Sequence, residues 1–270
     1  MKNIVNLSRC LAAVLLLSVS ACVKDPKPET PHPPAPDWLL TKIEISEKRG
    51  EPEGGPVYYS YGREEYEYNQ HYKPSLHRSY YGEDSNHMVL RYVDTLSYDN
   101  KLRPIRKGIK RETGAPYEVR YTYSGDDVNP TKEEQYSGGT LSWSTKFIYR
   151  DTIVYQISSH SDTTRHLYSE RGNFLGSYYG DYGFFPEYNE YDNHPNPARY
   201  LNLNIARVLS IPEADRGPLD SSNNWLDDLQ QFIESRIITY DAFGKVSKSV
   251  VTYFAPGRVV TSVYHYTKPD

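Results

Sequence analysis

The sequence predicts an all-β fold, a single antiparallel β-meander that forms a strongly curved sheet or an open barrel. From residue 38 onward, apolar and polar residues alternate with a period of two, as in strands with one buried face. Short turn signals separate these runs, and short connections indicate antiparallel neighbours because parallel pairs need long crossovers. Tyrosine, which favours strands, supplies 27 of 270 residues against 7 Phe and 3 Trp.

Residues 1–21 have the features of a secretory signal peptide. Lys2 and Arg9 give a positive start, and a short apolar run at 11–19 follows. The run ends in Val-Ser-Ala-Cys, which resembles the lipobox of bacterial lipoproteins and predicts cleavage before Cys22 and lipid on its sulfur. The alternatives are an ordinary secretion signal and a membrane-spanning anchor, but spanning a bilayer takes about 20 apolar residues.

Residues 22–37 then comprise the lipidated cysteine and a Pro-rich tether, with six prolines between positions 26 and 36. A Pro-rich segment extends about 3.1 Å per residue, so the tether could hold a domain roughly 40–50 Å from the lipid. This organisation predicts a protein anchored to the outer membrane by lipid and exposed at the cell surface. A position facing the periplasm is the alternative.

Residues 38–270 are predicted to form one domain of roughly ten to twelve strands, at the usual strand length. In 117–123, for example, tyrosines and a valine alternate with charged or polar residues. The turn at 240–244 has an aspartate to cap it and Gly244 to accept the positive φ that such a turn requires. It predicts a hairpin between 237–240 and 246–254.

The pattern breaks at 200–232, where we predict one inserted short helix or long loop. Ser222 or Asn224 could cap the helix, and one face would carry the apolar side chains of Trp225, Leu229 and Phe232. Its expected role is to cover an end or a face of the sheet.

A weak internal repeat runs through the domain, with Tyr-Asp-Ala-Phe-Gly at 240–244 as its cleanest copy. A variant lies at 168–172, and the copy at 98–102 has leucine in place of glycine. The repeat resembles, distantly, the tyrosine-aspartate repeats of Rhs-type proteins.

Over residues 39–268 the chain resembles more closely a group of Bacteroidetes lipoproteins with a tyrosine-rich, porin-like β-meander domain of unknown function. The matching features are the lipobox, Tyr-Asp-Asn-His-Pro-Asn-Pro at 191–197, Ser-Ser-Asn-Asn at 221–224 and the closing strands from 237 to 267. The resemblance implies a Bacteroidetes cell envelope and carries no established activity.

The sequence contains no recognisable catalytic, metal or cofactor motif. The histidines outside the tether have no zinc-site spacing, so each is interpreted as a polar strand or loop residue. Glu64 and Glu65 would point to opposite faces of a strand, and Asp94 only interrupts an apolar face. Acidic and basic residues are mixed, with a net charge of −4, so nucleic acid is not an expected partner.

These observations favour a non-enzymatic surface protein that binds or scaffolds an extracellular ligand, with a glycan as the leading candidate. The first alternative is a structural or assembly protein of the envelope, and a glycan hydrolase with dispersed carboxylates is less favoured. The densest aromatic stretch gives the candidate ligand-binding residues: Tyr178, Tyr179, Tyr182, Phe184 and Phe185. The alternative is that these rings only contribute to packing within the sheet and bind no ligand.

Overall fold

The computed structural model describes residues 36–50, 55–159, 162–170, 173–179, 183–186, 191–197, 223–225, 233–254 and 257–269. The chain divides into two units, Met1–Pro34 and Ala35–Asp270, and the described residues all belong to the second. The predicted signal peptide, Cys22 and almost all of the tether therefore lie outside the described residues.

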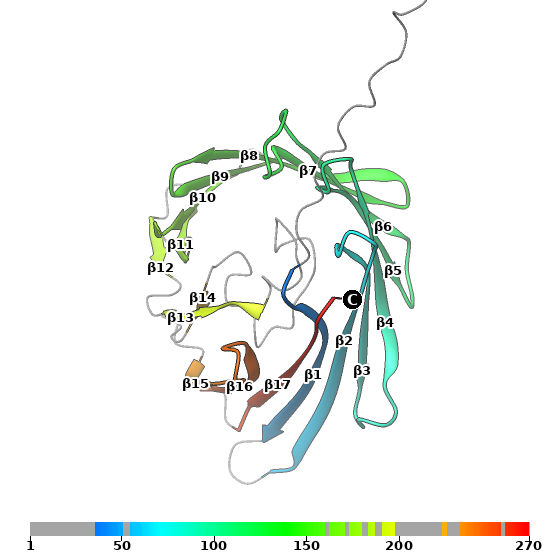
Figure 1. Cartoon of the computed structure of the whole chain (residues 1–270), viewed down its shortest axis with the longest axis vertical. Helices are drawn as coiled ribbons and strands as arrows, with labels where there is room; N and C mark the ends of the chain where they lie inside the picture. The colour runs from blue at the N-terminus through cyan, green and yellow to red at the C-terminus, as the bar shows by residue number, and fades with distance from the viewer. Residues whose placement is uncertain are drawn as a thin grey trace, which may run out of the picture. The chain divides into compact units, whose positions relative to one another are not determined.

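Seventeen strands are described, and fifteen of them form one sheet in which every pairing is antiparallel (Figure 1). The order is β12-β11-β10-β9-β8-β7-β6-β5-β4-β3-β2-β1-β17-β16-β15. Neighbours in the sheet are thus neighbours in sequence, except where β17 returns beside β1. The predicted meander is confirmed, with more strands than the expected ten to twelve. Their bounds are β1 Leu39–Gly50, β2 Val57–Tyr68, β3 Pro74–Gly82, β4 Val89–Tyr98, β5 Pro104–Arg111, β6 Tyr117–Thr122, β7 Lys132–Ser137, β8 Thr140–Arg150, β9 Ile153–Ser158, β10 Thr163–Tyr168, β11 Phe174–Tyr179, β12 Phe184–Pro186, β13 Tyr191–Pro195, β14 Asn223–Trp225, β15 Ile233–Tyr240, β16 Val246–Tyr253 and β17 Val259–Thr267.

The sheet is curled but not closed by strand pairing, because its order ends at β12 and β15. The small β13–β14 sheet supplies side-chain links to strands near both ends of this order. Tyr191 of β13 donates its hydroxyl to the carbonyl of Phe174 in β11, and Tyr240 of β15 donates to the Asp192 carboxylate. The His194 ring stacks on Tyr240 with centroids 4.0 Å apart.

The predicted insertion at 200–232 is described only at 223–225. These three residues form β14, paired with β13, so the proposed helix does not begin at Ser222 or Asn224. Pairing to a neighbouring strand has overridden the capping signal, and Trp225 is extended rather than helical. The rest of the segment lies outside the described residues. Within the described part of the chain, no helix is long and apolar enough to cross a membrane.

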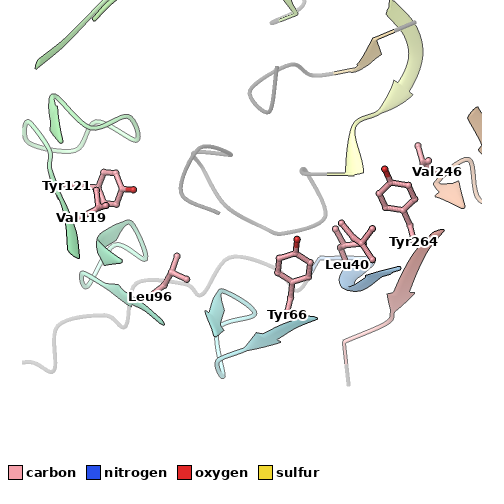
Figure 2. Packing of buried hydrophobic residues seen from close by; sticks show 8 residues of the cluster. Leu40, Tyr66, Leu96, Val119, Tyr121, Val246 and Tyr264 are labelled. Atoms are coloured by element: carbon pink, nitrogen blue, oxygen red, sulfur yellow. The ribbon is translucent and has the colours of Figure 1, made fainter. Parts of the chain in front are cut away.

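Alternation gives the curled sheet two chemically different faces. The concave face carries a core of buried side chains from six strands, which point toward the inside of the curl (Figure 2). Each fully buried aliphatic side chain contributes about 1.5–3 kcal/mol. The convex face carries ion pairs such as Arg63–Glu65 and Lys132–Glu134 and is therefore solvated. The core residues are Leu40, Ile43, Tyr66, Leu96, Val119, Tyr121, Val246 and Tyr264.

One edge of the sheet, here called the turn rim, is formed by the matching five-residue turns 69–73, 99–103 and 241–245. In each, the first side chain accepts hydrogen bonds from the backbone N–H groups two and four residues later, at 2.8–3.1 Å. The fourth residue has positive φ, +76° at Gly244, which confirms the prediction. Leu102 takes the same conformation at +59°, so the copy without glycine folds alike.

Tyrosines near the strand ends complete this rim. Tyr98, at the end of β4, donates its hydroxyl to the carbonyl of Pro74 at the start of β3. Tyr68, Tyr123 and Tyr266 donate in the same way to carbonyls at the near ends of neighbouring strands, those of Leu40, Pro104 and Val246. These four tyrosines therefore have a structural role at the turn rim.

Candidate functional site

The predicted aromatic stretch is split between the two faces of the sheet. Tyr178 and Phe184 occupy opposite positions on β11 and β12, with ring centroids 4.9 Å apart, and the Arg165 guanidinium lies 4.6 Å from the Tyr178 centroid. This group is on the convex face. The adjacent Tyr179 points to the concave face, in register with Thr164.

The remaining two predicted residues add little. Tyr182 lies outside the described residues, and only the backbone of Phe185 is described, opposite Ser177. Tyr178 and Tyr179 cannot share one plane on opposite faces. The single five-ring platform that the sequence suggested is therefore not present among the described residues.

A different set of side chains comes together on the concave face, directly opposite residues of the core on neighbouring strands. His77 of β3 is 0% exposed and lies between two carboxylates. Its Nε2 is 2.7 Å from Glu64 Oε2, and its Nδ1 is 3.1 Å from Asp94 Oδ2. Ser79 donates its hydroxyl to the other Glu64 oxygen at 2.9 Å, and the Tyr66 ring stacks on the imidazole at 4.8 Å.

This group extends along the same face as what we call the polar belt. Lys107 of β5 is buried next to Asp94, and Glu133 of β7 accepts a hydrogen bond from Gln135 Nε2 at 2.8 Å. Gln135 also accepts the hydroxyl hydrogen of Tyr117. The polar belt comprises Glu64, His77, Asp94, Lys107, Glu133 and Thr145.

The surroundings of the belt shift the pKa values of His77 and Lys107 in opposite directions. Burial alone would disfavour the charged imidazole, but hydrogen bonds to Asp94 and Glu64 outweigh it and raise the pKa of His77. Burial lowers the pKa of Lys107, although the nearby carboxylates of Asp94 and Glu133 favour its charged form. The belt therefore holds an imidazole favoured as a cation and an amine that burial works against.

The edge of the sheet opposite the turn rim is here called the loop rim and includes the loops at 82–89, 112–116 and 138–139. On the concave face, side chains become more exposed to solvent from the polar belt toward this rim. Along β2, Glu64 is buried, Ser60 is half-buried and Tyr58 is 56% exposed. The loop-rim end of the concave face carries a row of half-buried and exposed rings that we call the aromatic margin: Tyr58, Tyr81, Tyr92, Tyr117, Trp143 and Tyr179.

The sequence interpretation missed the polar belt. His77 is not an ordinary polar strand residue, because it is fully buried between two carboxylates, and Asp94 is its partner rather than an interruption. The signal was present as a polar residue near the middle of the apolar face in successive strands. It could not be read without the register that aligns these positions across the sheet.

Metal chemistry finds no support among the described residues, where no group of three or more His, Cys, Asp or Glu side chains is arranged to hold an ion. Asp192 accepts the backbone N–H of His194 at 2.9 Å and the Tyr240 hydroxyl. Its oxygens therefore serve the turn and the link to β15.

Comparison with known proteins shows a likeness to solved structures only. No protein-family model matches the chain, and no curated protein matches it. Among solved structures it is similar to a porin-like protein from Bacteroides uniformis, with TM-score 0.49 and 14% identity, over 87% of this chain and 98% of that one. A likeness at this level does not indicate what either chain binds.

Proposed function

We propose that this chain is a non-enzymatic lipoprotein of the outer membrane, exposed at the cell surface, which binds a neutral glycan at the aromatic margin. The observation that carries the proposal is the row of partly exposed rings on the concave face, together with a belt of largely buried polar groups on the same face. Sugars have apolar C–H faces that pack on aromatic rings and hydroxyls that need hydrogen-bond partners, so this combination suits them.

The placement of the margin supports access for a large ligand. The chain enters the sheet at the turn rim, where Leu39 pairs with Thr267, and the margin lies at the opposite edge. A lipid-linked tether would thus join the domain at the end remote from the binding residues. Exposed apolar side chains also gather at the loop rim, including Val57, Tyr59, Val89, Leu90, Leu141 and Phe254.

Charge on the concave face favours a neutral ligand. Neither sign dominates, because acidic and basic side chains alternate across the strands and several pair with one another. Among the described residues, the charged side chains on this face include Glu47, Arg49, Glu64, His77, Asp94, Lys107, Arg111, Glu133, Arg236 and Arg258.

Binding is favoured over hydrolysis because the converging carboxylates are occupied. Glu64 uses one oxygen for His77 and the other for Ser79, and Asp94 holds the opposite side of the imidazole. A glycosidase needs two carboxyl groups that face the scissile bond from either side. Here both face a histidine.

Adjacent tyrosines in β2 allow a matched test. Tyr58 faces the concave side and Tyr59 the convex side, and they are 56% and 52% exposed. The mature lipidated chain in detergent would be screened on an array of neutral glycans, and then Tyr58→Ala and Tyr59→Ala would be compared on the best binder. We expect Tyr58→Ala to weaken binding by roughly threefold to tenfold, with Tyr59→Ala unchanged.

Both rings are exposed, so neither change should lower the melting temperature appreciably. Equal losses in the two variants, or a loss only in Tyr59→Ala, would contradict a site on the concave face. A chain that binds no glycan on the array but co-purifies with an envelope protein would instead support the structural alternative.

A further inference from the structure

Two buried residues of the polar belt, Asp94 and Lys107, have side-chain atoms that could form hydrogen bonds which the described residues do not supply. Asp94 is 1% exposed; its Oδ2 bonds His77, whereas its Oδ1 is buried and accepts no hydrogen bond from the described part of the chain. The Lys107 amine likewise forms no hydrogen bond or ion pair with any described residue. An unpaired oxygen such as Asp94 Oδ1 is costly to bury, so in a folded protein it calls for a partner.

The two residues are neighbours on the concave face of two adjacent strands. Asp94 pairs with Ile109 and Lys107 pairs with Leu96, so the aspartate and the lysine are diagonal neighbours on the concave face of β4 and β5. Tyr92 of the aromatic margin lies two residues from Asp94 on the same face, about 7 Å along the strand. A ring held at the margin would therefore lie within reach of this pair.

The chemistry of the pair selects one kind of ligand atom. An ammonium only donates hydrogen bonds and a carboxylate only accepts them, so a hydroxyl, which does both, can satisfy the two together. Asp94 and Glu133 would repel an anionic group, and Lys107 would repel a cationic one. We infer that Asp94 and Lys107 form a hydroxyl-binding point beside the aromatic margin, which takes a hydroxyl of a neutral sugar. This inference rests on the proposed function and specifies how it is carried out.

The test uses a change that should separate binding from folding. Lys107→Met keeps the length of the side chain and removes its charge and its donors, while Lys110→Met makes the same change at an exposed position of the same strand. Affinities for cellohexaose, xylohexaose, mannohexaose and maltohexaose would be measured by titration calorimetry on the mature lipidated chain in detergent. Melting temperatures would be measured on the same samples.

We expect Lys107→Met to weaken binding of the hexasaccharide that the wild type binds by about tenfold. Its melting temperature should stay the same or rise, because burial works against the charged amine. Lys110→Met should change neither quantity. Weak binding together with an unchanged fold would mark a ligand contact, which a merely structural lysine could not produce.

The contrary outcomes are distinct. If Lys107→Met binds as tightly as the wild type while Tyr58→Ala binds weakly, the hydroxyl-binding point is wrong and the proposed function stands. If the melting temperature of Lys107→Met falls together with its affinity, the amine is structural and the inference is again wrong. If the wild type binds none of the four hexasaccharides and no neutral glycan on the array, the proposed function fails with it.

Discussion

At the scale of single residues, the polar belt depends on His77. The imidazole joins three adjacent strands because its two nitrogens contact Glu64 of β2 and Asp94 of β4. Removing the imidazole would leave two buried carboxylates without their shared partner, and an uncompensated buried charge strongly destabilises the folded state. The histidine thus couples local proton chemistry to the stability of the concave face.

The raised pKa of His77 predicts a pH-dependent stability. A group whose pKa is higher in the folded state stabilises the fold fully below its unfolded pKa, about 6.5 for histidine. That contribution is lost as the pH rises through the folded pKa. In urea titrations from pH 6 upward, the free energy of unfolding should therefore fall, and the fall should be smaller in His77→Gln.

His87 supplies the control, because its side chain is 84% exposed in the loop between β3 and β4. His87→Gln should keep the wild-type pH profile. A His77→Gln profile that parallels the wild type would show that the imidazole does not carry a bound proton between the carboxylates.

At the scale of elements, the five-residue turns explain how a long meander keeps its register. Each turn uses one side-chain oxygen to hold two backbone N–H groups and one residue with positive φ to reverse the chain. The sequence predicted this at Asp241 and Gly244. It did not reveal that Asn69 with Tyr72 forms the same turn, because non-glycine residues at positive φ give no clear sequence signal.

Gly244→Val should destabilise the domain. The space around Gly244 is open, so the cost comes from forcing a β-branched residue to φ near +76° rather than from a clash. We expect a loss of at least about 1–2 kcal/mol in urea unfolding. Gly244→Asn should lose much less, since asparagine tolerates this conformation, and equal stability of the valine variant would refute the turn account.

At the scale of the whole molecule, alternation and turn signals were enough to predict the meander, whereas the candidate site was largely hidden. Tyr179 was identified from sequence and lies on the concave face. Tyr178 and Phe184 were grouped with it, although alternation along β11 places them on the convex face. The belt requires residues 64, 77, 94 and 107 to meet across four strands. Only the register of those strands places them together.

The anchor is tested by lipid labelling. Cys22→Ala should abolish incorporation of labelled palmitate and release the protein from the membrane fraction, since lipid would have no sulfur to join. Cys10→Ala changes the only other cysteine, within the predicted signal peptide, and should leave labelling intact. Undiminished labelling of the Cys22→Ala protein would exclude a lipid anchor at this residue.

The central claim is that a neutral glycan binds on the concave face at the loop rim. The most direct measurement is tyrosine iodination of the mature protein, followed by mass spectrometry, with and without the best glycan from the array. We predict that the glycan protects Tyr58, Tyr81 and Tyr179 and leaves Tyr59 and Tyr178 as reactive as before. Protection of the two convex tyrosines, with the three concave ones unchanged, would contradict the claim.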